Sequence, residues 1–240
     1  MDLDGSGGAT LTLLNPSGGV LGGDVLATSV TLGRDSRVCL TTPAATRVYR
    51  SLGAPAVVTF EAAVGEGAAL EYVPDHLIPS PGARLRQRTT VTLAAGATLL
   101  LVDAWAVGRV ARGEAWQFHE LDTALTVRDA RGLLLAERAV LDETRGWDGL
   151  GGTEGCSYVG TFVAAAPSAE GWEEIAGELS RTVAALDTGA RVGVTPLARG
   201  GLLARLLCPS APALEASVRA LWTASRRRLL GLPPLALRKL

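Results

Sequence analysis

The sequence predicts a mainly β protein with two helices near its C-terminal end, and three features carry this prediction. Residues 10–165 hold short apolar or alternating runs that are typical of strands, with no long helical pattern between them. Glycine, proline and aspartate separate these runs at close intervals. Only residues 168–231 show the apolar spacing of amphipathic helices. Strand following strand without an intervening helix favours all-β layers over an α/β fold.

The predicted strands fill the first two-thirds of the chain. Each run stops at a turn signal, such as Gly33, Gly96 or the proline-glycine segment 79–82. In chain order the runs span residues 10–14, 25–32, 37–40, 57–64, 70–73, 85–93, 99–102, 115–127, 133–141 and 158–165. Their periodicity alone leaves a sandwich, a barrel and a solenoid open.

The first predicted helix covers residues 168–186. Ser168 precedes its apolar pattern, so we expect the serine side chain to cap the first turn. After this helix a hairpin is predicted from residues 191–197 and 202–207. The residues on the apolar face of the helix are Trp172, Ile175, Ala176, Leu179 and Val183.

The second predicted helix covers residues 211–230. Pro212 lies in its first turn and Gly231 follows its last residue, which are the positions that these residue types favour. Arg226, Arg227 and Arg228 fall in the last turn, where cations complement the helix dipole. We therefore expect these three arginines to face solvent rather than to bind nucleic acid.

Bulk composition narrows the class of protein. The chain has 240 residues and a formal net charge of −1, which predicts binding neither to nucleic acid nor to an anionic membrane. Hydrophobic residues make up 48% of the chain, yet no apolar run reaches the about 20 residues of a membrane helix. Because no secretory signal pattern opens the sequence, we expect a cytoplasmic protein. The high apolar content favours surfaces that partners cover.

Motif searches yield no catalytic constellation. His76 and His119 lack the spacing of a zinc site. Ser157 lies in a glycine-rich loop before a strand, whereas a nucleophile elbow needs a helix after the serine. The three cysteines are widely spaced and odd in number, so we expect ordinary buried thiols rather than a disulfide framework. The sequence therefore predicts a protein that is not an enzyme.

Residues 15–24 form the most distinctive segment and read NPSGGVLGGD. The pairs Gly18-Gly19 and Gly22-Gly23 indicate a backbone that turns twice with no room for Cβ atoms. Standard phosphate-loop and dinucleotide-loop motifs are absent, although an enzyme with an anion-binding loop here is the alternative reading. We expect Asp24 to accept hydrogen bonds from the preceding turn in preference to binding a metal.

Together with residues 41–51 (TTPAATRVYRS), this segment resembles the UreD family of urease accessory proteins, also called UreH. The resemblance continues through residues 70–75 (LEYVPD), Asp103 and residues 108–114 (GRVARGE). It extends to the C-terminal strand and helix, so it covers residues 10–240 in consistent order.

The resemblance implies a fold and a function. It implies a single UreD-like domain over residues 1–240, with many short strands in stacked β-helix-like layers and a helical end at about residues 168–231. It also implies a non-enzymatic scaffold or chaperone that binds the urease apoprotein and the partners UreF and UreG. Such a protein assists nickel delivery into the urease active site, with no tightly bound cofactor and with nickel only in transit.

Acidic residues within apolar strands are the candidate nickel-conducting residues. An unpaired buried carboxylate costs several kcal/mol, so Glu71 and Asp103 each require a partner or contact with water. Carboxylates bind nickel more weakly than imidazole or thiolate, and would let the ion pass. On the positions that match the family, the resemblance implies a nickel passage at Glu71, Asp75 and Asp103, with His76 as a weaker member.

A structural alternative exists for the same carboxylates. Arg84, Arg86 and Arg88 alternate on one face of a predicted strand and are placed to neutralise a neighbouring acidic strand. Simple ion pairing with arginine would then account for the buried acids. A third reading of the whole chain is an all-β structural protein with no metal role.

The remaining matched residues are expected to hold turns and a partner surface. In addition to the two glycine pairs and Asp24, the set comprises Tyr49, Arg50, Gly108, Arg109, Gly113 and Glu114. UreD relatives usually carry several strands before the first glycine block, whereas here only residues 1–14 precede it. We therefore expect a truncated or misassigned start in preference to an exposed sheet edge that pairs with a partner.

Overall fold

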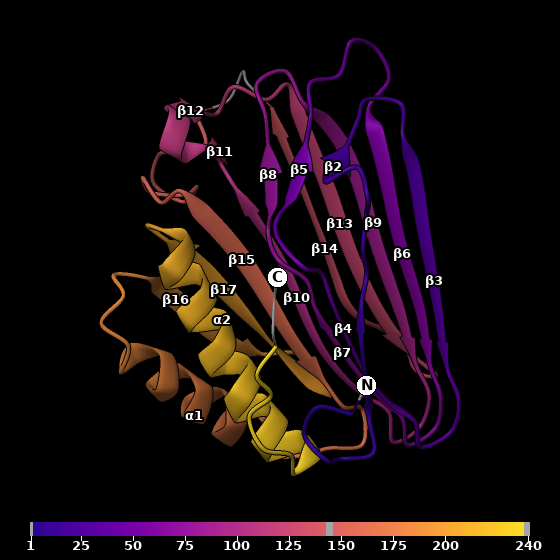
Figure 1. The fold of residues 1–240 in the computed structure, drawn as a ribbon. Coiled ribbons are helices and arrows are strands. Elements are labelled where there is room, and N and C mark those ends of the chain that lie inside the picture. Colours follow the sequence, from indigo (N-terminus) through magenta and orange to yellow (C-terminus); the bar gives the residue numbers. More distant parts are fainter. Residues whose placement is uncertain (1, 143–145, 238–240) are drawn as a thin grey trace.

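The strands of this chain wind into a β-solenoid that is flanked on one side by two helices (Figure 1). The computed structural model describes residues 2–142 and 146–237. Its strands are β1 (Ala9–Thr12), β2 (Gly19–Val20), β3 (Val25–Leu32), β4 (Arg37–Thr41), β5 (Thr46–Val48), β6 (Ala56–Val64), β7 (Ala69–Val73), β8 (Leu77–Pro79), β9 (Arg84–Leu93), β10 (Thr98–Ala106), β11 (Gly108–Arg109), β12 (Glu114–Ala115), β13 (Glu120–Asp129), β14 (Gly132–Asp142), β15 (Tyr158–Ala165), β16 (Arg191–Pro196) and β17 (Gly201–Cys208). The helices are α1 (Trp172–Ala184) and α2 (Ala211–Ser225), and a short 3₁₀ turn, η1, covers Val110–Arg112.

Parallel pairing stacks successive turns of the chain on one another. Sheet A begins with the parallel strands β1, β4, β7 and β10, and sheet B begins with β3, β6, β9 and β13. The short strands β2, β5 and β8 form a further parallel ladder, which joins sheet A because β8 also pairs with β10. Antiparallel strands then extend both sheets, β15, β17 and β16 in sheet A and β14 in sheet B. This arrangement confirms the predicted mainly β fold with stacked, β-helix-like layers.

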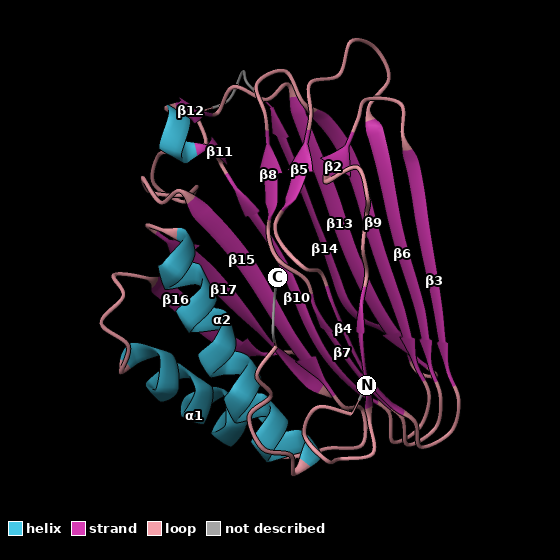
Figure 2. Cartoon of the chain, viewed as in Figure 1, coloured by secondary structure: helices cyan, strands magenta, loops and turns pink. Residues whose placement is uncertain are grey.

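Sheet A is apolar on both faces because another layer covers each of them. Leu99 and Leu101 of β10 point into the core between the two sheets, whereas Leu100 points into the core beneath the helices. Figure 2 shows both helices on the same side of the molecule, away from the outer strands of sheet B. Double burial explains why this strand reads as a continuous apolar run without alternation. Among the described residues, no helix is both long and apolar enough to cross a membrane.

Several element boundaries differ from the sequence prediction. The predicted strand 115–127 is two strands, because Trp116 adopts a positive φ of 60° and ends β12, and β13 begins only at Glu120. The two- and three-residue strands β2, β5, β8 and β11 were not predicted, since so few residues show no periodicity.

The helix ends were predicted with mixed success. Ser168 does not cap α1: its Oγ accepts a hydrogen bond from the amide of Gly96 (3.3 Å), and Gly171 occupies the N-cap position. In α2, Ser210 caps the first turn and Pro212 lies within it. A π-helical turn, η2 (Arg226–Leu230), prolongs α2, and Gly231 ends it in the left-handed conformation, as predicted.

The glycine block lies against the next turn of the solenoid. A Cβ on Gly19 would lie 2.4 Å from the Arg47 carbonyl oxygen and 2.8 Å from the Tyr49 ring, and one on Gly22 would lie 2.7 Å from the Ser51 Cα. Asp24 Oδ2 accepts a hydrogen bond from the Leu21 amide (2.8 Å), which confirms its expected turn-closing role. These residues therefore hold two layers of backbone together.

This close approach generates a stability prediction. Gly19→Val should lower the free energy of unfolding by about 1–3 kcal/mol, because the added side chain overlaps a backbone carbonyl that cannot move alone. Gly53→Val is the matched control, since a Cβ there meets nothing within 4 Å. Chemical denaturation measures both variants. Equal unfolding free energies for the two would contradict the packing role of Gly19.

Candidate functional site

The four residues predicted to line a nickel passage lie on two opposite faces of sheet A. Glu71 of β7 is aligned with Leu100 of β10, which points toward the helices. Asp75 and His76, in the link from β7 to β8, line a groove beside α2. Asp103 of β10 instead borders a cavity between the two sheets. The structure therefore separates Asp103 from the other three.

Glu71 is held in a buried ion pair with Arg226. The Arg226 Nε donates to both carboxylate oxygens of Glu71, at 3.0 and 2.8 Å, and the Trp222 indole donates to one of them at 2.6 Å. Glu71 is 5% exposed and Arg226 is 2% exposed. The ion-pair alternative therefore describes Glu71, although its partner comes from the helical end rather than from a neighbouring strand.

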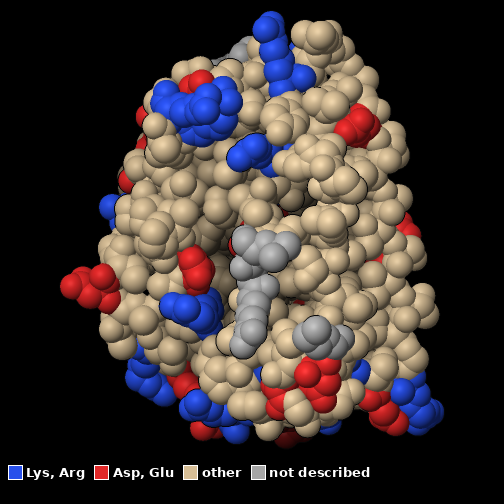
Figure 3. Space-filling view, in the orientation of Figure 1, with Lys and Arg blue, Asp and Glu red and all other residues tan. Residues whose placement is uncertain are grey.

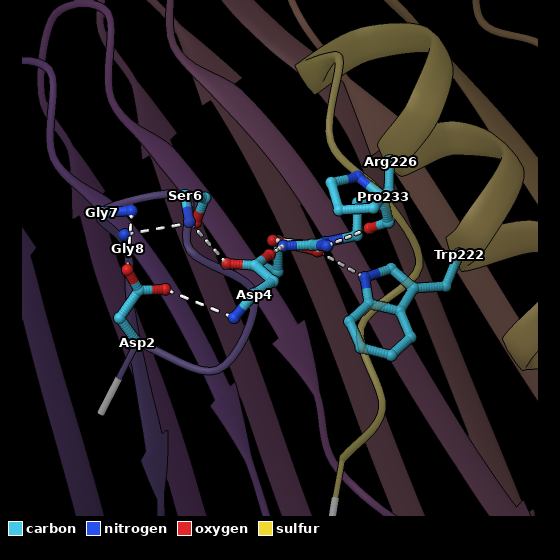
Figure 4. Close-up of polar contacts among 9 residues, drawn as sticks. Asp2, Asp4, Ser6, Gly7, Gly8, Trp222, Arg226 and Pro233 are labelled. Carbon is cyan, nitrogen blue, oxygen red and sulfur yellow. Dashed lines mark hydrogen bonds and ion pairs between the residues drawn. The ribbon is translucent and has the colours of Figure 1, made fainter.

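Arg226 also ties both ends of the described chain to this ion pair (Figure 4). Its Nη2 donates to Asp4 Oδ2 (2.5 Å) and its Nη1 donates to the Pro233 carbonyl. Burial would lower the pKa of Arg226, but the hydrogen bonds to Glu71 and Asp4 outweigh burial and raise it. Burial would likewise raise the pKa of Asp4, yet hydrogen bonds from Ser6 and Arg226 hold it well below its usual range.

The prediction that all three arginines of residues 226–228 face solvent is wrong for Arg226. Arg227 and Arg228 are exposed, whereas Arg226 continues the buried face of α2 one turn beyond Trp222. The sequence contained this signal, since position 226 follows Trp222 at the four-residue spacing of a helical face. The alternative role, pairing with a buried acid, was not recognised from it.

Asp75 and His76 lie at a groove of about 640 Å³ between α2 and sheet A. The Asp75 amide donates to Thr42 Oγ1 (2.8 Å), and the His76 ring contacts the Tyr158 ring edge-on, with centroids 5.2 Å apart. Glu215 and Arg219 of α2 are the other charged residues of the lining. On the face in view in Figure 3, many charged side chains lie near the upper and lower margins, and one acidic and one basic group lie side by side left of the middle.

Asp103 borders a cavity of about 80 Å³ between the two sheets. Its carboxylate accepts a hydrogen bond from the Gln87 side chain (3.0 Å). Burial raises the pKa of Asp103 to about 6, against the opposing effect of Gln87 and with a further contribution from the charge of Glu137. Asp103 is therefore a carboxyl group that changes its charge near neutral pH.

Glu137 of β14 lines the same cavity and was missed from the sequence. Burial raises its pKa, while Arg205 of β17, 2.5 Å away, opposes that shift. Glu137 lies on a strand in the second sheet, 34 positions along the chain from Asp103, so periodicity offered no signal that the two acids meet. The cavity thus brings together two carboxyl groups that burial disfavours as anions.

Two of the β9 arginines, Arg86 and Arg88, pair with acids other than Glu71 and Asp103, the two for which arginine pairing was the structural alternative. Asp122 of β13 is 4% exposed and pairs with Arg88 (2.5 Å) and Arg138 (3.1 Å). Arg86 lies 3.6 Å from Glu120 on the same pair of strands. Two guanidinium groups neutralise the Asp122 carboxylate. Asp103 has only the neutral Gln87 amide as its partner, so its carboxylate, when ionised, adds negative charge to the cavity.

The remaining matched residues build turns at one end of the solenoid. Arg109 forms a two-point ion pair with Glu114, with the Nη2 donating at 2.9 Å, and Gly113 closes the η1 turn between them in the left-handed conformation. A Cβ on Gly108 would lie 2.1 Å from the Glu114 carbonyl oxygen. Arg50 lies against Gly82, where a Cβ would approach its side chain to 3.1 Å. These contacts give the block a packing role.

The fold and these sites define a β-solenoid protein with a small cavity between its sheets, lined by two acids and two arginines. In residues 2–142 and 146–237, no three His, Cys, Asp or Glu side chains gather into a group that could hold a metal ion. The chain matches the family model described as UreD urease accessory protein over residues 2–239. It belongs to that family.

Relatives named urease accessory protein UreD extend over nearly the whole chain. The relative from Mycolicibacterium gilvum (strain PYR-GCK) is 35% identical over 233 residues, which cover 95% of this chain and 82% of that protein. The relative from Dechloromonas aromatica (strain RCB) is 36% identical, covering 92% and 76%. The one from Actinomyces naeslundii is 33% identical, covering 99% and 86%. These matches confirm the resemblance drawn from the motif blocks.

The buried ion pair yields a stability prediction. Arg226→Met should cost about 3–5 kcal/mol of unfolding free energy, because it leaves the Glu71 carboxylate buried without a counter-charge. Arg227→Met, at the exposed neighbouring position, should change it by less than about 0.5 kcal/mol. Combining Glu71→Gln with Arg226→Met should recover part of the loss in urea titrations. A double variant as unstable as the sum of both single variants would contradict the pairing.

Asp103 should give stability a pH dependence. Its folded pKa of about 6 exceeds the about 3.9 of an unfolded chain. A carboxyl group with a raised pKa contributes stability that is fully present below the unfolded value and is lost as pH rises through the folded value. Asp103→Asn should therefore stabilise the protein at pH 8, by up to about 3 kcal/mol, but not at pH 3.5. A gain independent of pH would show that Asp103 is not a titrating group.

Proposed function

We propose that this chain is a scaffold for urease maturation that passes nickel through the cavity at Asp103 and Glu137. Membership of the UreD urease accessory protein family supports a role in urease maturation. Its partners in this proposal are the urease apoprotein, UreF and UreG. The observation that carries the proposal is a pair of carboxyl groups on a small cavity between the two sheets of a protein from this family.

The chemistry of the two carboxyl groups suits an ion in transit. Oxygen ligands hold nickel less firmly than imidazole or thiolate, and the cavity offers two acids rather than a full coordination shell. Asp103 is largely ionised above pH 6 and attracts a dication, whereas below that pH the protonated group does not. Arg205 pairs with Glu137 and limits the negative charge, which weakens retention of the ion. Weak binding at each point favours passage over storage.

Glu71 takes a different role in this proposal. Its carboxylate already accepts from Arg226 and Trp222, so binding a dication there would require breaking a buried ion pair. We therefore assign Glu71 to holding the helical end on sheet A. Asp75 and His76, on the open groove, are accessible to a partner or to an arriving ion on the helix side.

The proposal is tested by urease assembled with variants of this chain. Asp103→Asn and Glu137→Gln should lower the nickel content of co-expressed urease, while the tagged chain still co-purifies with its maturation partners. Glu66→Gln, in the exposed ion pair with Arg34, is the control and should leave nickel unchanged. Elemental analysis and tagged pull-down measure the two outcomes.

Each possible failure has a distinct meaning. If both cavity variants support full nickel loading, the cavity is not the route. If they abolish co-purification, the cavity residues act in assembly instead. If the unmodified chain fails to co-purify with any urease component, the scaffold role itself is wrong.

A further inference from the structure

At one margin of the molecule, two ion pairs join sheet A to sheet B. Arg205 of β17 pairs with Glu137 of β14 at 2.5 Å. Arg199, in the turn before β17, pairs with Asp129 at the end of β13, also at 2.5 Å. Only the pair of Arg205 with Glu137 lines the cavity between the sheets. In Figure 1, β17 and β16 lie on the left, beyond β15. This pair therefore links the two sheets at the wall of the cavity.

One row of side chains leads from Arg205 to Asp103. In sheet A, Asp103 is aligned with Thr161 of β15, and Thr161 is aligned with Arg205. Directly opposed residues of antiparallel strands point to the same face, and all three of these residues line the cavity. Glu137 faces the row from sheet B. Arg205 thus occupies the outer end of the row and Asp103 the inner end.

The side chain of Arg205 is held less firmly than that of Arg199. It is 59% exposed, and its only hydrogen bond among the described residues goes to Glu137 Oε1. Arg199 is 28% exposed and donates to both carboxylate oxygens of Asp129 and to a main-chain carbonyl. The next position in the row beyond Arg205 is Gly193 of β16, where a Cβ would meet nothing within 4 Å. Arg205 therefore has space into which it can turn away from the cavity.

We propose that Arg205 and Glu137 form an exchange latch: Arg205 pairs with Glu137 until a dication enters the cavity and takes its place. This inference rests on the proposed passage of nickel through the cavity. With the exchange latch closed, the guanidinium supplies one positive charge to Glu137. A dication between Glu137 and Asp103 supplies two, so neither carboxylate is left without a counter-charge while Arg205 turns outward. When Arg205 returns, it competes for Glu137 and weakens the hold on the ion.

The exchange latch also discriminates between kinds of cation. A monovalent ion brings no more charge than the guanidinium that it must displace, and it forms no directional hydrogen bond to the carboxylate. A dication gains from both Glu137 and Asp103. Arg138, the second arginine of the lining, donates to both carboxylate oxygens of Asp122, each at 3.1 Å. Of the two lining arginines, Arg205 is thus the one that competes with an ion for Glu137.

Calorimetric titration of the untagged full chain with Ni²⁺ alone tests the exchange latch without urease. Arg205→Gln should tighten Ni²⁺ binding by about 10-fold, because the guanidinium no longer competes for Glu137. Arg205→Lys keeps the positive charge and should lose most of this gain. Adding Glu137→Gln to Arg205→Gln should abolish the gain. Arg191→Gln is the matched control, since the Arg191 side chain is also 59% exposed but its partner, Glu154, lies outside the cavity lining.

The release of the ion is measured separately. Stopped-flow transfer of Ni²⁺ to a chelator should be slower from Arg205→Gln than from the unmodified chain, because no guanidinium displaces the ion. Circular dichroism and urea titration check the folding of every variant. An Arg205→Gln chain that is less stable but binds Ni²⁺ with unchanged affinity would show a purely structural ion pair and overturn the proposal. Undetectable binding by this variant, release at an unchanged rate, or an equal gain from Arg191→Gln would also overturn it.

The exchange latch and the nickel route fail separately. If Asp103→Asn lowers the nickel content of urease but Arg205→Gln leaves Ni²⁺ affinity unchanged, the route stands and the exchange latch is wrong. If Arg205→Gln tightens Ni²⁺ binding and slows release, while neither Asp103→Asn nor Glu137→Gln alters the nickel content of urease, the exchange latch stands and the route is wrong.

Discussion

Burial of sheet A on both of its faces is the constraint on which the rest of the structure depends. Its central strand β10 sends alternate leucines into two separate cores, one against sheet B and one against the helices. A polar side chain in such a sheet is shielded from water, so it needs a hydrogen-bond or ion-pair partner within the protein. Glu71 and Asp103 are both in this position, and each has a different kind of partner.

On the helix side, the partner of Glu71 is the positively charged guanidinium group of Arg226. Arg226 reaches Glu71 only because the π-helical turn prolongs the buried face of α2, and its other nitrogens bind Asp4 and the Pro233 carbonyl. One guanidinium therefore joins the sheet, the last helix and segments near both ends of the chain. On the side of sheet B, Asp103 borders a small cavity and its partner is the neutral amide of Gln87, which donates one hydrogen bond. The pKa of Asp103 is raised to about 6, so the group ionises near neutral pH.

This division separates stability from transport in the proposed function. A saturated ion pair suits a structural clamp, since adding or removing a cation there would leave a buried charge uncompensated. A carboxyl group with one neutral partner suits passage, since it gains or loses a cation at little cost. Glu71 and Asp103 have similar sequence surroundings, since each lies within or at the end of an apolar strand. Because side chains alternate along a strand, the two acids nevertheless point to opposite faces of sheet A.

The sequence by itself determined the order of the strands, including the apolar run of β10, because strands depend on local periodicity. It also determined the ends of α2 near Pro212 and Gly231 through turn chemistry, and the family through motifs that occur in a consistent order. It also placed cationic side chains along β9, although these pair with Glu120 and Asp122 rather than with Glu71 or Asp103. Only the tertiary structure decided which acid meets which partner. Ser168 was drawn away from its helix by Gly96, Arg226 was turned inward, and Glu137 was brought to Asp103. Such contacts join residues that are distant along the chain, and neither spacing nor composition encodes a meeting that depends on how layers stack.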